Sequence, residues 1–145
     1  MSDREQRQEI AKEFTSAAFY GFLSEHKLMG SRCETCGASY LPPRPLCTAC
    51  YGEAMEWVEM PGQGKLIAFT TIHIAPTAMI EAGYDRNKPY CAGIVQLEGG
   101  PAISAQILGV DATQPEQIQI GTPLRVAFIE RGEGKEQRTY LAFER

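Results

Sequence analysis

The sequence predicts a mainly β fold in three parts: an N-terminal helix, a small four-cysteine module and a five-stranded barrel. Three observations lead to this prediction. Helical periodicity marks the start of the chain, two CxxC pairs follow it, and later runs alternate apolar and polar residues with a period of two. A chain of 145 residues can bury one core and carry a module stabilised in another way. We predict boundaries at 1–26, 27–60 and 61–145.

The first part is predicted to be an amphipathic helix over about residues 3–25. Apolar residues there recur near the helical repeat: Ile10, Phe14, Ala17, Ala18, Phe22 and Leu23. The apolar stripe contains several aromatic rings, so it packs either on the rest of the chain or on another protein. We favour a partner protein, because a terminal helix beside a small module has little core of its own to pack against.

The second part contains two pairs of cysteines, Cys33 with Cys36 and Cys47 with Cys50, separated by ten residues. Two CxxC turns present four thiolates, which is the tetrahedral ligand set of a structural Zn²⁺ site with Zn–S distances of about 2.3 Å. Four sulfurs leave no coordination position for water or substrate, so the metal is expected to be structural. Such binding supplies on the order of 10–16 kcal/mol of apparent folding free energy.

The sequence gives weaker support to other roles for these cysteines. The stretch 1–10 is polar and has no apolar signal-peptide core, so we expect the chain in a reducing cytoplasm, where disulfides are rare. A redox CxxC motif is also possible, but two copies at this spacing favour a metal. Iron fits the same four sulfurs, and the sequence does not separate it from zinc.

The third part is predicted to be a five-stranded OB barrel. Five runs are rich in β-branched and aromatic residues: 65–75, 89–97, 101–108, 123–131 and 138–144. Turns are expected at 98–101 and 132–134. The sequence Thr-Gln-Pro-Glu at 113–116 predicts a capping box and a short helical turn between the third and fourth strands. Five strands with a helical element after the third match an OB barrel better than a sandwich.

Charge argues against nucleic-acid binding. The formal net charge is −4 and the sequence pI is about 5.2, whereas phosphate neutralisation needs an excess of cations. The alternative of an OB-fold nucleic-acid-binding zinc-ribbon protein is disfavoured further, because 62–145 contains eight Lys and Arg against nine acids. No apolar run is long enough to suggest a membrane span. Arg44, between prolines that stiffen its backbone, is the best single candidate for a phosphate contact.

Candidates for catalysis are few. A stand-alone thioesterase-like enzyme would have to use Cys91 or His73, which lie in neighbouring predicted strands. Cys91 stands in an apolar run, where a thiol behaves as a small hydrophobic side chain.

The connection 76–88 is long for a small barrel and contains apolar residues, so it either binds a ligand or partner or packs its apolar side chains as a satellite cluster.

Taken in order, these motifs resemble the OB-fold, rubredoxin-like zinc-ribbon proteins associated with acyl-CoA enzymes of the thiolase superfamily. The resemblance covers nearly the whole chain. Its motifs are the cysteine-bearing segments 33–37 and 41–50, then 64–66, 73–76, 89–90 and 120–126.

The resemblance implies a non-catalytic accessory subunit in a hetero-oligomer with a thiolase-superfamily protein. Such a subunit helps to bind the CoA moiety of an acyl-CoA, while the partner forms or cleaves the carbon–carbon bond, for example in the breakdown of aromatic compounds or steroid side chains. The four cysteines are then the metal ligands, and no residue of this chain is catalytic. Possible phosphate contacts are Lys27, Arg32, Arg44 and Lys65.

Overall fold

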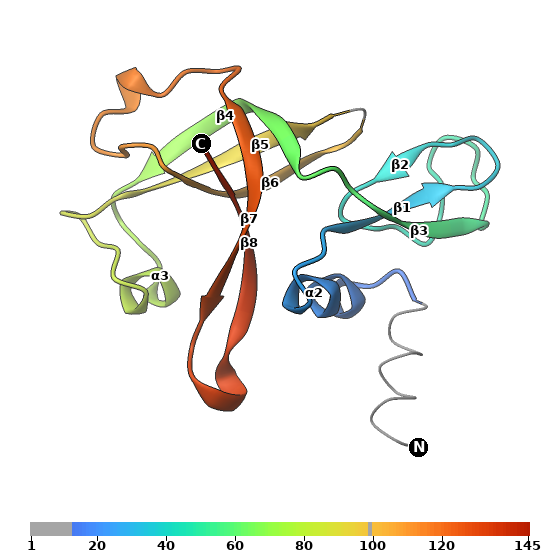
Figure 1. The fold of residues 1–145 in the computed structure, drawn as a ribbon, viewed down its shortest axis with the longest axis horizontal. Coiled ribbons are helices and arrows are strands. Elements are labelled where there is room, and N and C mark those ends of the chain that lie inside the picture. The colour runs from blue at the N-terminus through green and yellow to red at the C-terminus, as the bar shows by residue number, and fades with distance from the viewer. Residues whose placement is uncertain (1–12, 99) are drawn as a thin grey trace. The chain divides into compact units, whose positions relative to one another are not determined.

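The computed structural model describes residues 13–98 and 100–145 (Figure 1). These residues form two compact units, one made of 13–61 with 100–101 and the other of 62–98 with 102–145. The mainly β architecture with an N-terminal helix, a four-cysteine module and a five-stranded barrel is therefore confirmed. The division at residues 26 and 60 remains a prediction.

Helix α2, Ser16–Ser24, begins the first unit. Thr15 caps its N-terminus, because the Thr15 hydroxyl accepts a hydrogen bond of 3.2 Å from the backbone N–H of Ala18. Residues 3–12 of the predicted helix lie outside the described residues. Residues 13–15 are not helical, so the prediction of one unbroken helix to residue 25 is wrong at this point. The cap explains why the helix begins at Ser16.

Aromatic side chains join α2 to the small sheet beside it. The ring of Phe14 stacks on Trp57 with a centroid distance of 4.7 Å, and Phe22 meets Trp57 edge-on at 4.9 Å. These two aromatic residues therefore pack within their own unit, which is the alternative that we disfavoured. Tyr20 remains 56% exposed.

The small sheet has three strands in the order β2-β1-β3. Their bounds are Met29–Cys33 for β1, Ser39–Tyr40 for β2 and Met55–Glu59 for β3, and both pairings are antiparallel. Gly30 in β1 is required by packing, because a Cβ there would collide with Met60 and with the carbonyl oxygen of Tyr40. Close backbone contact at this glycine lets the central strand lie tightly against its neighbours.

The second unit is a closed barrel with strand order β4-β5-β6-β8-β7. Its strands are β4 (Gln63–Ile72), β5 (Tyr90–Leu97), β6 (Ala102–Leu108), β7 (Pro123–Arg131) and β8 (Arg138–Glu144). Strands β6 and β8 pair in parallel, and all the other pairs are antiparallel. The five predicted strands and the OB barrel are confirmed.

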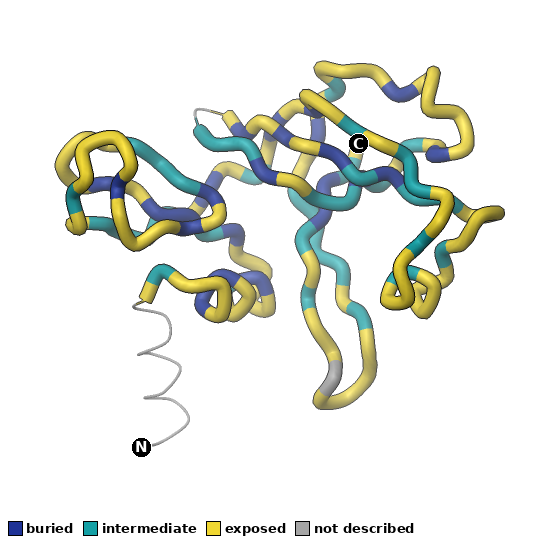
Figure 2. Tube along the Cα trace, turned by 180° about the vertical axis from the view of Figure 1, so that it is seen from behind, coloured by how far each residue is buried: buried dark blue, intermediate teal, exposed yellow. Residues whose placement is uncertain are grey.

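Alternating side chains fill the barrel interior. The buried residues that carry them are the dark blue segments along the strands in Figure 2. Leu66, Val95 and Phe143 are fully buried. Gly93 lies opposite Phe69, and a Cβ added to it would come within 2.9 Å of the Ala68 carbonyl oxygen and of Ile107 Cγ1. The register of β4 shifts between Leu66 and Ala68, which gives the local bend that a small closed barrel requires.

Short helical turns occupy the connections of the barrel. Helix α3, Thr77–Glu81, follows β4, and two 3-10 turns follow β6 and β7 at Pro115–Gln117 and Gly134–Glu136. The predicted helical turn after the third strand is confirmed, but its capping box is wrong. The cap residue is Gln114 without a side-chain bond, and the Thr113 hydroxyl instead donates to Asp111 at 2.5 Å. No helix among the described residues has the length and apolarity to cross a bilayer.

Candidate metal centre

The two CxxC turns share one backbone geometry. Cys33 ends β1, and the N–H of Gly37 donates to the Cys33 carbonyl oxygen at 2.9 Å, with Gly37 at φ 80°. In the second turn the N–H of Tyr51 donates to the Cys47 carbonyl oxygen at 2.8 Å, with Tyr51 at φ 62°. Each turn therefore ends in a residue with left-handed backbone conformation. The closed turn keeps its two cysteines close together.

The four sulfurs converge. The ligand atoms of Cys33, Cys36, Cys47 and Cys50 all lie within 4.8 Å of one another, and sulfurs of opposite turns approach to 3.5 Å and 3.4 Å. A tetrahedron with Zn–S bonds of about 2.3 Å has S–S edges of about 3.8 Å. The arrangement fits a zinc ion held by four thiolates. Cys33 and Cys47 are buried, whereas Cys36 and Cys50 lie at the surface.

Tyr40 orients the second turn. Its hydroxyl lies 3.4 Å from the Cys47 sulfur and accepts a hydrogen bond of 3.0 Å from the backbone N–H of Thr48. The hydrogen bond from Tyr40, aided by the backbone N–H of Cys50, lowers the pKa of the Cys47 thiol to about 6. Groups that hold a ligand in this way stabilise the thiolate that a metal binds. The sequence analysis did not single out Tyr40, because nothing in its spacing from the cysteines marks it.

Crowding of sulfur has the opposite effect on Cys50. The backbone of Gly52 lowers the pKa of the Cys50 thiol, but the neighbouring sulfurs of Cys33 and Cys47 outweigh it and raise that pKa to about 12. Four thiolates at these distances repel one another without a cation between them. A divalent cation with affinity for sulfur offsets this repulsion, so the donor set is suited to zinc.

The predicted phosphate contacts have different surroundings. In the first unit, the guanidinium of Arg32 pairs with Glu56 at 2.5 Å, and the Lys27 ammonium lies 3.9 Å from a Glu25 oxygen. The Arg44 guanidinium lies over the ring of Tyr40 at 5.9 Å. Of these three cations, Arg44 is the one for which no carboxylate lies within 4.0 Å in the described part of the chain.

Two of these arginines lie on opposite sides of the small sheet. The backbone N–H of Arg44 donates to the Ser31 hydroxyl at 2.8 Å. Ser31 and Arg32 are consecutive in β1, so their side chains project to opposite faces. The structure therefore does not bring Arg32 and Arg44 together. Lys65 is exposed on β4 in the other unit.

Cys91 and His73 do not form a nucleophile and base. Cys91 faces the barrel core in β5 and is 2% exposed, and burial raises the pKa of its thiol. It pairs with Thr71 in the register of β4, whereas His73 lies beyond the end of that strand and is exposed. A buried thiol with a raised pKa is unreactive, so this site offers no activated nucleophile.

Family comparisons agree with both units. Residues 22–56 match the family described as "ChsH2, rubredoxin-like zinc ribbon domain", and residues 57–128 match "ChsH2, C-terminal OB-fold domain". A DUF35 domain-containing scaffold protein of Methanocaldococcus jannaschii is 33% identical over 102 residues, which cover 70% of this chain and 67% of that protein. The chain belongs to the ChsH2 family of DUF35 proteins, and its cysteine module is a zinc ribbon.

Two further relatives are named as parts of enzymes. The benzoylsuccinyl-CoA thiolase subunit BbsA of Thauera aromatica is 33% identical over 82 residues, covering 57% of this chain and 52% of BbsA. A chain of the Ltp2-ChsH2(DUF35) aldolase superposes with a TM-score of 0.71 at 23% identity, covering 88% of this chain and 91% of that one. The structural similarity to the aldolase chain supports the fold alone.

Proposed function

We propose that this chain is a non-catalytic accessory subunit of a heteromeric thiolase-superfamily enzyme that acts on an acyl-CoA in the cytoplasm. The observation that carries the proposal is the closed set of four sulfurs in a chain whose relatives include a named thiolase subunit. A metal with four protein ligands has no position for substrate, so its role is to hold the ribbon in shape. Bond-forming or bond-breaking groups then belong to the partner subunit.

The proposal is tested by native purification. A tag on this chain, expressed in its own host, is expected to recover a thiolase-type protein in a fixed ratio, measured by native mass spectrometry. The isolated chain is expected to show no turnover of acyl-CoA, whereas the recovered complex turns it over. Recovery of the chain alone, or turnover by the isolated chain that Cys91→Ala abolishes, would contradict the proposal.

Within this function we assign the chain a share in binding the CoA moiety. The candidates for contacts with its phosphates are the four cations predicted from the sequence, Lys27, Arg32, Arg44 and Lys65. Arg44 is the first to test, because Glu56 already neutralises Arg32 and a single Arg–phosphate contact needs a guanidinium with free donors. In the complex, Arg44→Gln is expected to raise KM for the acyl-CoA several-fold with kcat little changed. Arg125→Gln serves as the matched control, because Arg125 is not among the candidates and its guanidinium already pairs with Glu144 at 2.9 Å.

A further inference from the structure

An arginine-centred cluster lies on the outer surface of the barrel. The Arg131 guanidinium donates to the Gln106 side-chain oxygen at 2.6 Å, approaches the Met79 sulfur at 3.4 Å and lies over the Tyr140 ring at 5.4 Å. The Gln106 amide in turn donates to the Tyr84 hydroxyl at 3.0 Å. We call these five residues the Arg131 cluster.

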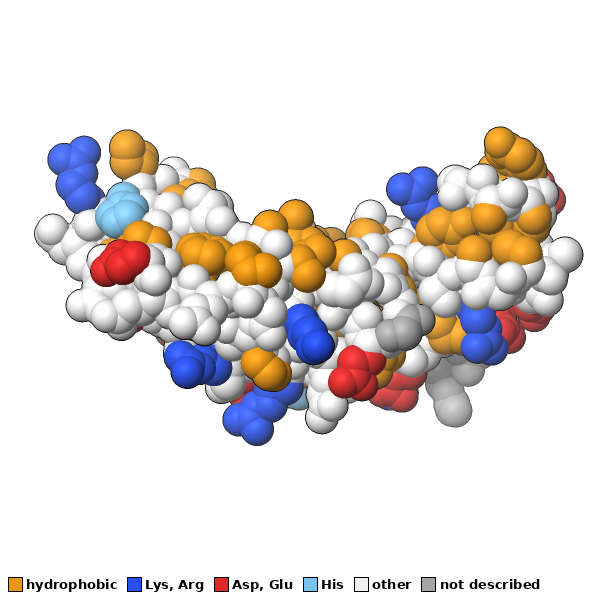
Figure 3. All heavy atoms as spheres, turned by 90° about the horizontal axis from the view of Figure 1, so that it is seen from above, with side chains coloured by type: hydrophobic (Ala, Val, Ile, Leu, Met, Phe, Trp, Pro, Cys, Tyr) orange, Lys and Arg blue, Asp and Glu red, His pale blue; other side chains and the backbone are white. Residues whose placement is uncertain are grey.

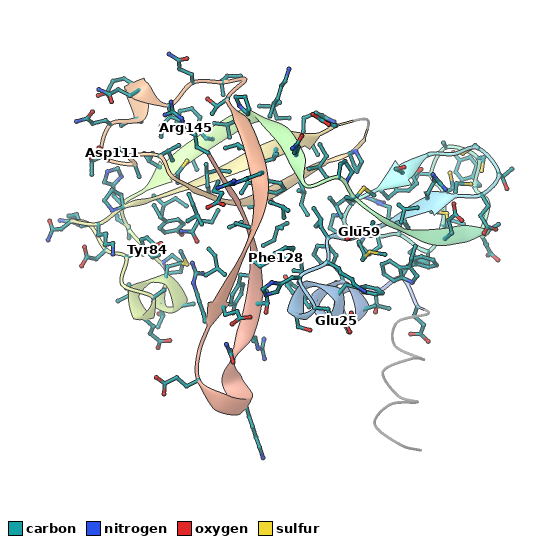
Figure 4. All side chains as sticks on the ribbon, viewed as in Figure 1. Glu25, Glu59, Tyr84, Asp111, Phe128 and Arg145 are labelled. Carbon is teal, nitrogen blue, oxygen red and sulfur yellow. The ribbon has the colours of Figure 1, made fainter. Side chains whose placement is uncertain are left out.

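The cluster joins three parts of the second unit. Arg131 and Tyr140 come from the β7–β8 hairpin, Gln106 from β6, and Met79 and Tyr84 from the connection that contains α3. That connection lies beside the hairpin (Figure 1), and Tyr84 stands between α3 and the strands (Figure 4). Met79 and Tyr84 of the connection are therefore half-buried by contacts with the barrel, whereas the other residues of α3 are exposed.

Arg131 has no acidic partner in the described part of the chain. No carboxylate lies within 4.0 Å of its guanidinium there, whereas Arg125 on the same face of β7 pairs with Glu144 at 2.9 Å. Arg131 also faces Arg138 directly across the hairpin, and like charges in opposed positions repel. A second cation, Lys88, lies over the Tyr84 ring at 5.6 Å. The cluster therefore contains one guanidinium without a carboxylate partner in the described part of the chain, with Arg138 opposite it, while Lys88 lies beside Asp85.

Donors remain available at this position. A guanidinium has five N–H groups, and the contacts of Arg131 with Gln106 and Met79 occupy two of them. A thioether sulfur is a weak acceptor. The Tyr84 hydroxyl accepts a hydrogen bond from Gln106, so its own proton is available for donation. The Arg131 guanidinium and the Tyr84 hydroxyl both contact the Gln106 amide, so a carboxylate at the cluster would meet donors that are already oriented.

Apolar surface is exposed in the cluster and next to it in sequence. Tyr140 of the cluster is 39% exposed, and Ile80, which follows Met79 in α3, is 55% exposed. Seen from above, the protein also has hydrophobic side chains on another part of its surface (Figure 3). Tyr, Met and Arg are enriched in protein interfaces, and Tyr and Arg carry much of the binding energy there. These surroundings favour binding of a protein over binding of a small anion, because a site for a small anion needs a ring of polar donors.

We propose that the Arg131 cluster is a docking site for the thiolase-type partner subunit, which places an Asp or Glu carboxylate on the Arg131 guanidinium. This inference rests on the proposed function and adds the surface through which the subunit binds. Charge complementarity carries it: the partner supplies the carboxylate that this arginine lacks in the described part of the chain, and the exposed side chains of Tyr140 and Ile80 offer apolar contact area beside the pair.

The experiment measures the affinity between this chain and the purified thiolase-type subunit recovered with it, by biolayer interferometry. Arg131→Gln is expected to raise Kd at least about tenfold, and Arg131→Lys to raise it less. The wild-type affinity should fall more steeply with added salt than that of Arg131→Gln. Arg125→Gln is the matched control and should leave Kd unchanged, because Arg125 already has its carboxylate.

A second variant protects the test against misfolding. Ile80→Ser lies outside the Arg131 hydrogen bonds and is expected to raise Kd about fivefold, with the amide spectrum of the barrel unchanged. Equal affinity of Arg131→Gln and wild type would overturn the docking site while the proposed function stands. Absence of any thiolase-type partner would overturn both. Loss of binding of free CoA by Arg131→Gln, with unchanged affinity for the partner, would assign the arginine to CoA instead.

Discussion

Tyr51 and Gly37 occupy equivalent positions in the two cysteine turns but differ in their conformational cost. A left-handed φ costs a non-glycine residue on the order of 1 kcal/mol, and Tyr51 is 78% exposed, so few contacts offset that cost. Tyr51→Gly is therefore expected to stabilise the zinc-bound ribbon by about 0.5–1 kcal/mol. Gly37→Ala should destabilise it by about 1 kcal/mol. Urea unfolding followed by the fluorescence of Trp57 measures both, and the same sign for the two variants would contradict this account.

Asp111 gives a residue-scale prediction about pH. Hydrogen bonds from the Thr113 hydroxyl and then from its backbone N–H lower the pKa of the Asp111 carboxyl below its ordinary value of 3.8. Because the folded-state pKa is depressed, the stabilisation by this carboxylate is present above pH 3.8 and is lost as pH falls through the folded-state value.

NMR titration of the Asp111 carboxyl carbon tests this. We expect a midpoint below 3.8 in the wild type and a shift back toward it in Thr113→Val, which keeps the backbone N–H but removes the hydroxyl. A midpoint unchanged by the substitution would show that the hydroxyl is not the main cause.

At the scale of elements, two glycines respond to the same substitution in opposite ways. A Cβ at Gly93 in β5 would meet Leu66, Ala68 and Ile107 at 2.8–2.9 Å, so Gly93→Ala should overpack the barrel and destabilise it by about 1–3 kcal/mol. Gly21 in α2 has nothing within 4 Å of an added Cβ, and Gly21→Ala should stabilise by about 0.5–1 kcal/mol. Thermal unfolding of both variants checks the contrast, which a shift of the same sign would refute.

Strands were predictable from the sequence because each buries one face. In β5 the buried residues Cys91, Val95 and Leu97 alternate with more exposed ones. This alternation with a period of two could be detected in the sequence alone. The start of α2 was not, because it depends on the Thr15 cap and not on apolar periodicity. The capping box at 113–116 failed because Asp111, two residues earlier, competes for the Thr113 hydroxyl.

The candidate sites also differ in how far they could be predicted from the sequence. Cysteine spacing alone indicated the convergence of the four sulfurs, because two CxxC turns have few other uses at this distance. The Arg131 cluster depends on contacts between residues 52 positions apart in sequence, Met79 and Arg131, and no local pattern reports such a contact. Tyr40 was missed for a related reason, since its hydroxyl reaches Cys47 only after the small sheet has formed.

For the whole molecule, the two units should depend differently on metal. Binding of Zn²⁺ by four thiolates contributes on the order of 10–16 kcal/mol, which is as large as the complete stability of a typical domain at about 5–15 kcal/mol. The first unit, with its short strands, should therefore lose its structure when zinc is removed. The barrel has its own core of residues such as Leu66, Val95 and Phe143 and should keep its structure.

Hydrogen exchange with mass spectrometry distinguishes these outcomes. After chelation under reducing conditions, peptides from 27–60 should exchange at the rate of an unfolded chain, while peptides from β4 to β8 stay protected; Cys47→Ser should reproduce this pattern without a chelator. Cys91→Ser is the matched control, because Cys91 lies outside the ribbon: it should weaken the barrel and leave the zinc content at one ion per chain. Protection of 27–60 in metal-free, reduced protein would show that the ribbon folds without zinc, and the structural role of the four sulfurs would then be wrong.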